Sequence, residues 1–233
     1  MDINGKKVVI TGVSRGIGNA LVHQFLAKGC LVGGMGLNDP QIDNPNFSFY
    51  RTNIRKSNDV SESFTEFFNV HGNEIDILVN NAGLGSFGVV ESYSDEQIST
   101  MFETNVYGTL YTCREAVPIM KKQGSGHIIN IASTAGLEGY PEVSVYCGTK
   151  HAVKAISESM YKELRDYAVK VTCIYPGSVK TDFFNDIDAI TAHDYMLQPQ
   201  DVAQMIVQAT QTPPNFHQVN LEVRPLQPKG PKK

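Results

Sequence analysis

Residues 11–18 read TGVSRGIG and join an apolar, β-branched run to a segment in which Ile17, Leu21 and Phe25 recur at every fourth position. The glycines allow a tight turn and a close approach of the backbone to a ligand, and the start of a helix offers free N–H groups to a pyrophosphate. Strand, glycine turn and helix in this order predict a nucleotide-binding turn. Taken alone, the same turn could be an ordinary connection between a strand and a helix.

Apolar runs alternate with helical segments along most of the chain. A second helical segment carries Ala152, Ile156, Met160 and Leu164 on one face. The candidate strands are Lys7–Thr11, Cys30–Met35, Phe47–Tyr50, Ile75–Asn80, His127–Ala132, Val169–Tyr175 and Val219–Val223. The alternation predicts an α/β fold, a doubly wound parallel sheet with right-handed crossovers and helices on both faces.

One connection in this pattern is short. Only Leu37 to Asn46 separate the second and third strands, and Pro40 and Pro45 lie within them. Proline disfavours helix at its own position and at the preceding residue. We expect an irregular loop there in place of a crossover helix.

Length and composition fit a single domain. The 233 residues are 41% hydrophobic and 19% charged, and no internal segment resembles a linker. We expect a domain over residues 1–224 and a flexible C-terminal tail over residues 225–233.

Charge and cysteine content exclude several classes of partner and location. The net charge of −4 argues against a broad nucleic-acid interface and against an anionic membrane surface. Four widely spaced cysteines without a Cys-x-x-Cys pair, and no apolar run of about 18 residues, favour a reduced, cytoplasmic protein. No His, Cys, Asp and Glu cluster has the spacing of metal ligands, so no metal is expected.

Polar residues follow several of the predicted strands. Asn53 follows the third strand, Asn80-Asn81-Ala82-Gly83 ends the fourth, Ser133 follows the fifth and Pro176-Gly177 the sixth. Each alone could be an ordinary turn former. Because ligands bind at the carboxyl ends of parallel strands, their common placement predicts one cleft.

Tyr146 and Lys150 lie four residues apart in the helical segment that follows Ser133. This spacing places both side chains on one helix face. An ammonium group near a phenol favours the phenolate, so Lys150 is expected to lower the pKa of Tyr146 from its usual value near 10. The alternative is an ordinary tyrosine with an exposed lysine one turn later.

Together, the glycine turn, Asn80–Gly83, Asn105, Ser133, the Tyr146/Lys150 pair and Pro176-Gly177 resemble the short-chain dehydrogenase/reductase family in order and spacing, over about residues 5–182. The resemblance implies a Rossmann fold with strand order 3-2-1-4-5-6-7 and hydride transfer between a nicotinamide cofactor and a carbonyl or alcohol.

The resemblance also implies roles for individual residues. Tyr146 is the general acid or base, Lys150 lowers its pKa and holds the nicotinamide ribose, Ser133 binds the substrate oxygen, and Asn105 holds a water that links Lys150 to solvent. His127 and His151 are expected to be bystanders. The implied cofactor-binding residues are Gly12, Ser14, Arg15, Gly16, Ile17, Gly18, Asn53, Ile54, Asn81, Ala82, Gly83, Tyr146, Lys150, Pro176, Gly177, Val179 and Thr181.

The sequence departs from the NAD-specific pattern of that family. The position of the usual ribose-binding Asp is Gly36, and Arg15 stands where NADP-dependent members carry a cation, but the usual second basic position is Leu37. We expect NADP(H) to be preferred, with NAD(H) as the alternative. Asn53 replaces an Asp that contacts adenine, and its amide oxygen can still accept that hydrogen bond.

The segment from Phe183 to Leu197 occupies the position of the family's substrate loop and is short. Phe183, a predicted substrate-binding residue with Ser133 and Tyr146, could form an apolar wall or could be ordinary packing. The same two readings apply to the other apolar side chains expected near it, which are Phe184, Tyr195, Leu84 and Tyr140.

The predicted activity is that of an oxidoreductase acting on a small-molecule carbonyl or alcohol. The alternative is a catalytically silent cofactor-binding regulatory module on the same fold. The resemblance further implies a homodimer or homotetramer, built on the helical regions Glu96–Met120 and Tyr146–Tyr167.

Overall fold

The computed structural model describes residues 1–181, 183 and 193–228. Its centre is a seven-stranded sheet in the order β3-β2-β1-β4-β5-β6-β7, and every neighbouring pair is parallel. The strands are β1 (Lys7–Thr11), β2 (Leu31–Gly36), β3 (Phe47–Arg51), β4 (Ile77–Asn80), β5 (Gly126–Ile131), β6 (Val169–Pro176) and β7 (Asn220–Val223). The predicted doubly wound sheet and its strand order are confirmed.

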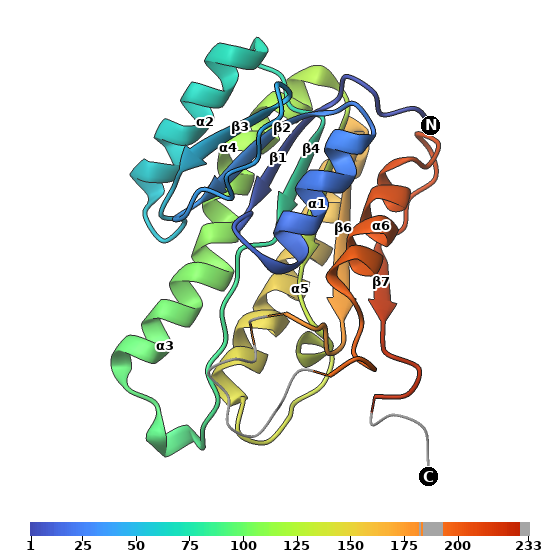
Figure 1. The fold of residues 1–233 in the computed structure, drawn as a ribbon. Coiled ribbons are helices and arrows are strands. Elements are labelled where there is room, and N and C mark those ends of the chain that lie inside the picture. Colours follow the sequence, from blue (N-terminus) through green and yellow to red (C-terminus); the bar gives the residue numbers. More distant parts are fainter. Residues whose placement is uncertain (182, 184–192, 229–233) are drawn as a thin grey trace.

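Helices cover both faces of the sheet (Figure 1). The described helices are α1 (Gly16–Ala27), α2 (Ser57–His71), α3 (Asp95–Phe102), α4 (Gly108–Gln123), α5 (Ser144–Leu164) and α6 (Pro199–Thr210), with short turns η1 (Val90–Ser92), η3 (Thr134–Gly136) and η4 (Arg165–Tyr167) and a π-helical turn η2 (Glu103–Tyr107). Helices α1 and α6 pack on one face, and α2, α4 and α5 on the other.

The alternation of side chains along β1 shows how the two cores arise. Val8 and Ile10 pack with α1 and α6, whereas Val9 packs with α2, α4 and α5, and all three are fully buried. A parallel sheet covered on both faces requires such continuous apolar runs, which explains why the strands were recognisable in the sequence.

Two element boundaries show where local sequence and pairing differ. The connection between β2 and β3 contains no helix, as its two prolines predicted. Strand β4 begins at Ile77, two residues later than expected, because the N–H of Ile75 donates to the side chain of Gln123 and not to a neighbouring strand. Among the described residues, no helix has the length and apolar character needed to span a bilayer.

Candidate active site

A cleft of about 1370 Å³ lies at the carboxyl ends of the strands. It is lined by every residue of the predicted cofactor set except Gly18, and by Ser133 and Phe183. The cleft therefore brings together segments from β1, β3, β4, β5, α5 and β6 that lie far apart in sequence. Neither His127 nor His151 lines it.

The glycine turn forms the floor at the N-terminus of α1. Gly12 and Gly16 have φ values of +72° and +60°, which side chains rarely adopt. A Cβ on Gly18 would lie 2.1 Å from the carbonyl oxygen of Gly12. Gly18 is therefore required for the close packing of α1 on the glycine turn, and it does not line the cleft. Among the described residues, no side chain caps α1, so its first N–H groups are available to a phosphate. The cradle thus fits a dinucleotide.

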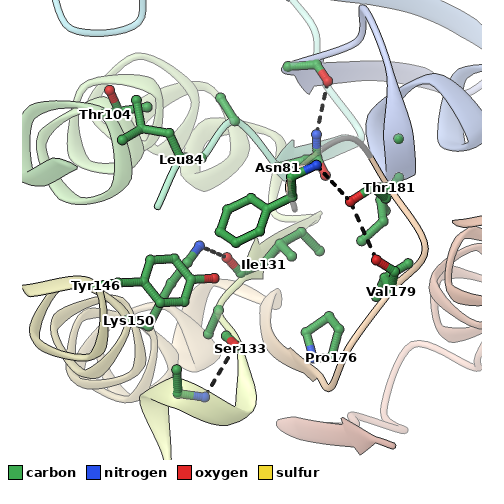
Figure 2. Close-up of a pocket in the computed structure, with 18 of the residues that line it drawn as sticks. Asn81, Leu84, Thr104, Ile131, Ser133, Tyr146, Lys150, Pro176, Val179 and Thr181 are labelled. Carbon is green, nitrogen blue, oxygen red and sulfur yellow. Dashed lines mark hydrogen bonds between the residues drawn. The ribbon is translucent and has the colours of Figure 1, made fainter. Parts of the chain in front are cut away.

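Asn81 fastens the end of β4 to this turn. Its side-chain amide donates to the carbonyl oxygens of Thr11 and Gly12, at 2.9 and 3.0 Å. The Thr11 hydroxyl in turn accepts from the backbone N–H groups of Asn81 and Ala82, at 3.1 and 3.0 Å. Figure 2 shows Asn81 across the cleft from Tyr146. Thr11 was not among the predicted site residues, although it directly precedes the first glycine.

Tyr146 and Lys150 lie in the first turns of α5, near Ser133, which follows β5, and the Lys150 side chain points to Ile131 (Figure 2). The Lys150 ammonium nitrogen lies 5.7 Å from the centre of the Tyr146 ring and donates to the carbonyl oxygen of Ile131 at 2.9 Å. The Ser133 hydroxyl accepts from the N–H of Ala135 at 3.2 Å. The structure thus brings Ser133, Tyr146 and Lys150 together in the lining of one cleft.

Burial governs the titration of this group. It raises the pKa of Tyr146 to about 12, against a lowering hydrogen bond from Ser133, and it lowers the pKa of Lys150 to about 8. The direction for Tyr146 is opposite to the one expected from Lys150 alone. The largest cause is desolvation of the partly buried phenol, and the Lys150 ammonium donates its hydrogen bond to the Ile131 carbonyl instead.

Asn105 lies behind the cleft wall, in the π-helical turn η2, and is 1% exposed. Its amide nitrogen donates to Leu84 O at 2.8 Å and to Thr149 Oγ1 at 2.9 Å, and its oxygen accepts from the N–H of Leu84 at 2.9 Å. The side chain therefore ties the segment after β4 to α5, between Tyr146 and Lys150. Its predicted role in holding a water stays a prediction.

One end of the cleft holds the residues predicted to bind the adenosine, and we call it the adenosine end. It is lined by Arg15, Gly36, Leu37 and Asn38. Asp39 also lines it and accepts from the N–H of Gln41 at 2.8 Å. The sequence prediction did not include this carboxylate, because the family pattern places the ribose-binding acid at Gly36, three residues earlier.

Asn53 lines the adenosine end, and its side-chain oxygen accepts from the N–H of Arg55 at 3.2 Å. The expected contact of this oxygen with adenine stays a prediction.

The other end of the cleft holds the predicted substrate-binding residues, and we call it the substrate end. Aromatic and charged side chains line it. The Phe183 ring lies 5.5 Å from that of Tyr146, and Leu84 and Tyr140 also line the cleft. Tyr195 does not line it and is half exposed. Phe184 and residues 185–192 of the expected substrate loop lie outside the described residues.

Several lining residues of the substrate end were missed in the sequence, because only the course of the chain after β4, β5 and β7 places them there. They are Phe87, Pro141, Glu142, Arg224, Pro225 and Pro228. The described residues contain no group of three His, Cys, Asp or Glu side chains placed to hold a metal ion.

The chain is similar in sequence and fold to known proteins, and the similarity covers nearly its whole length. The family described as short chain dehydrogenase matches residues 6–191. An uncharacterized oxidoreductase of Staphylococcus epidermidis is 31% identical over 230 residues, which are 96% of this chain and 99% of the relative.

Two solved structures share the fold. The closed form of serine dehydrogenase complexed with NADP+ has a TM-score of 0.86 and 31% identity, over 94% of this chain and 95% of that one. ElxO with NADP bound has a TM-score of 0.83 and 28% identity, over 94% and 97%. The family match, together with the cleft and its tyrosine and lysine, establishes that the chain belongs to the short-chain dehydrogenase family.

Proposed function

We propose that this protein reduces a small-molecule carbonyl compound with NADPH, or oxidises the corresponding alcohol with NADP+. The observation that carries the proposal is the grouping of the Tyr146 phenol and Ser133 with the buried ammonium of Lys150, in a cleft whose other end fits a dinucleotide.

The residues of the cleft divide the work of the reaction. When bound, NADPH supplies a hydride to the carbonyl carbon. The Tyr146 hydroxyl donates its proton to the carbonyl oxygen, while the Ser133 hydroxyl donates a hydrogen bond to the same oxygen as negative charge develops. Lys150 holds the ribose and stabilises the tyrosinate that is left. With a pKa of about 12, Tyr146 is protonated at neutral pH, which is the form that reduction requires.

The test compares wild-type protein with Tyr146→Phe in an NADPH-oxidation assay against a panel of carbonyl compounds. We expect the variant to bind NADPH with unchanged Kd and to lose roughly 10²–10⁴ in kcat, because the proton donor is gone. Tyr161→Phe, on the same helix but outside the cleft, is the control and should retain activity. A wild-type protein that binds NADPH yet turns over no member of the panel would instead favour the regulatory module.

The preference for NADP(H) rests on the adenosine end of the cleft. Arg15 supplies a guanidinium suited to a 2′-phosphate, and Gly36 places no carboxylate at the ribose position. Similar proteins with solved structures contain NADP. Asp39 opposes the preference by charge, so its neutralisation should strengthen it.

Arg15→Ala tests this preference. We expect the ratio of kcat/KM with NADPH to that with NADH to fall roughly 10- to 150-fold, since a charge-assisted hydrogen bond contributes about 1.5–3 kcal/mol. Arg55→Ala is the matched control, because Arg55 lines the same cleft but pairs with Glu103 at 2.7 Å. A wild-type preference for NADH, or an unchanged ratio in Arg15→Ala, contradicts the assignment.

We also propose a homo-oligomer that buries the outer surfaces of η2, α4 and η4. Support comes from the large apolar side chains exposed there, Tyr107 at 46%, Leu110 at 41% and Tyr167 at 48%. Sedimentation of wild-type protein against Leu110→Glu tests the surface, and a wild-type monomer contradicts it.

A further inference from the structure

Two segments distant in sequence form the wall at the substrate end of the cleft. One is residues 137–143, which we call the β5–α5 loop and which follows Ser133 and η3; Tyr140 to Val143 line the cleft from it. The other is residues 224–228, which we call the C-terminal segment and which follows β7; Arg224, Pro225 and Pro228 line the cleft from it. Both segments therefore line the cleft that also holds Tyr146.

A single guanidinium joins the two segments. Arg224 Nη2 donates to Glu138 Oε1 at 2.9 Å, across 86 positions of sequence. The same carboxylate accepts the hydroxyl of Tyr140, a residue that lines the cleft. Arg224 Nε also donates to Glu222, two residues earlier on β7, so this second pair stays within one segment. Only the first pair therefore crosses the cleft wall.

Each segment is fixed at its base independently of this pair. The N–H of Gly177 donates to Val223 O at 2.7 Å, directly before the C-terminal segment begins. In the β5–α5 loop, the carbonyl oxygen of Glu142 accepts from the N–H of Gly88 at 2.7 Å and from the Tyr93 hydroxyl at 3.2 Å. Loss of the pair between Glu138 and Arg224 therefore leaves both attachments in place. Only the distance between the two segments can then change.

The exposure of the pair supports a local role. The side chains of Arg224 and Glu138 are 48% and 50% exposed, and exposed ion pairs contribute little to global stability. The hydrogen bonds from Tyr140 and Arg224 lower the pKa of Glu138, so the carboxylate is charged at neutral pH. A charged pair that joins two walls of a cleft without stabilising the fold acts on the shape of the cleft.

We propose that Glu138 and Arg224 form a clamp that holds the β5–α5 loop against the C-terminal segment and so limits the bulk of the substrate that reaches Tyr146. They act as positioning residues that determine specificity, because neither side chain takes part in the proton or hydride transfer proposed above. This inference rests on the proposed carbonyl reductase function.

The kinetic test uses two ketones with the same reactive group, one small and one with a bulky substituent. In Glu138→Gln and Arg224→Met we expect the ratio of kcat/KM for the bulky ketone to that for the small one to rise roughly 1.5- to fivefold, the range for loss of an exposed ion pair. The NADPH Kd and the thermal midpoint should stay unchanged.

Glu222→Gln is the matched control. It removes a partner of the same guanidinium at similar exposure, 46%, but one that does not cross the wall. Its selectivity ratio should stay at the wild-type value. An unchanged ratio in Glu138→Gln and Arg224→Met, or an equal rise in all three variants, overturns the clamp.

Hydrogen exchange separates failure of the clamp from failure of the proposed function. In Glu138→Gln the backbone N–H groups of both residues 137–143 and residues 224–228 should exchange faster than in wild type, whereas Glu222→Gln should leave the loop unchanged. A wild-type protein that reduces no carbonyl contradicts the proposed function and with it the role in selectivity. Unchanged exchange in Glu138→Gln contradicts the clamp, whatever the enzyme reduces.

Discussion

At the scale of single residues, the candidate chemistry depends on two ionisable groups that burial shifts towards their neutral forms. The pKa of Tyr146 rises to about 12, and that of Lys150 falls to about 8. The phenol therefore keeps its proton across the physiological range, while the ammonium begins to lose its charge just above that range. The lysine and not the tyrosine should set the alkaline limit of carbonyl reduction.

We expect kcat/KM for reduction to fall as pH rises through about 8, because Lys150 loses the charge that stabilises the tyrosinate. Below that pH the amine is protonated and activity should reach a plateau. In Lys150→Met the remaining activity should be lower and should show no break near pH 8. The profile of kcat/KM against pH measures this, with Lys154→Met, one turn further along α5, as the control that keeps the break. A break that persists in Lys150→Met would assign it to another group.

At the scale of elements, a chain of buried side-chain hydrogen bonds, which we call the polar ladder, connects helices α4 and α5 across strands β4 and β5. The Thr112 hydroxyl on α4 donates to Asn80 Oδ1 on β4 at 2.6 Å, and Asn80 Nδ2 donates to Asn130 Oδ1 on β5 at 2.8 Å. Asn130 Nδ2 then donates to the Ser157 hydroxyl on α5 at 2.9 Å. Asn80 and Asn130 are register partners, so pairing of β4 with β5 aligns the ladder. It holds α4 and α5, and hence Tyr146, against the sheet.

Asn130→Val should lower the free energy of unfolding by about 1–3 kcal/mol, because it removes one partner each from the buried Asn80 amide and the Ser157 hydroxyl, which then keep only Cys113 Sγ and the Val153 carbonyl. Urea unfolding measures this. Asn58→Ala, exposed on α2, is the control and should change stability by less than about 0.5 kcal/mol. Removal of Asn80 as well should cost less than the sum of the two single changes. A neutral Asn130→Val would show that the ladder is not needed for stability.

At the scale of the whole molecule, acid stability depends on a histidine at the opposite end of the sheet from the cleft. His127 on β5 is 7% exposed, and its Nε2 lies 2.7 Å from the Thr172 hydroxyl on β6. Burial, aided by His217 and Lys170, lowers the pKa of His127 to about 3. The folded protein thus holds this ring neutral at pH values where the unfolded chain, with a histidine pKa near 6.5, binds a proton.

Between pH 6.5 and 3 the unfolded state therefore binds more protons, and stability falls as pH falls, by at most about 1.4 kcal/mol per pH unit from this group. His127→Gln keeps a side-chain N–H for Thr172 and should flatten the decline, whereas exposed His23→Gln should not. Chemical unfolding across this pH range measures the difference. Parallel pH profiles for wild type and His127→Gln would contradict the assignment.

The sequence by itself determined the parallel sheet and most of the residues that line the cleft, and the family resemblance implied the strand order. Parallel strands buried on both faces must be apolar along their length, so they appear as separate runs, and a dinucleotide cradle requires glycines at fixed places. Gly18 shows why such a position is readable, since any side chain there would meet the carbonyl of Gly12. These constraints act within short segments, and a local pattern therefore reports them.

Only the tertiary structure decided which distant groups meet. The raised pKa of Tyr146 arises mainly from desolvation by surrounding elements, whereas the sequence predicted a pKa lowered by the lysine four residues away. Asp39 at the adenosine end and Arg224 beside Glu138 enter the cleft through the course of a loop and of the chain after β7. Burial and long-range charge pairing are properties of packed neighbours, so no spacing along the chain specifies them.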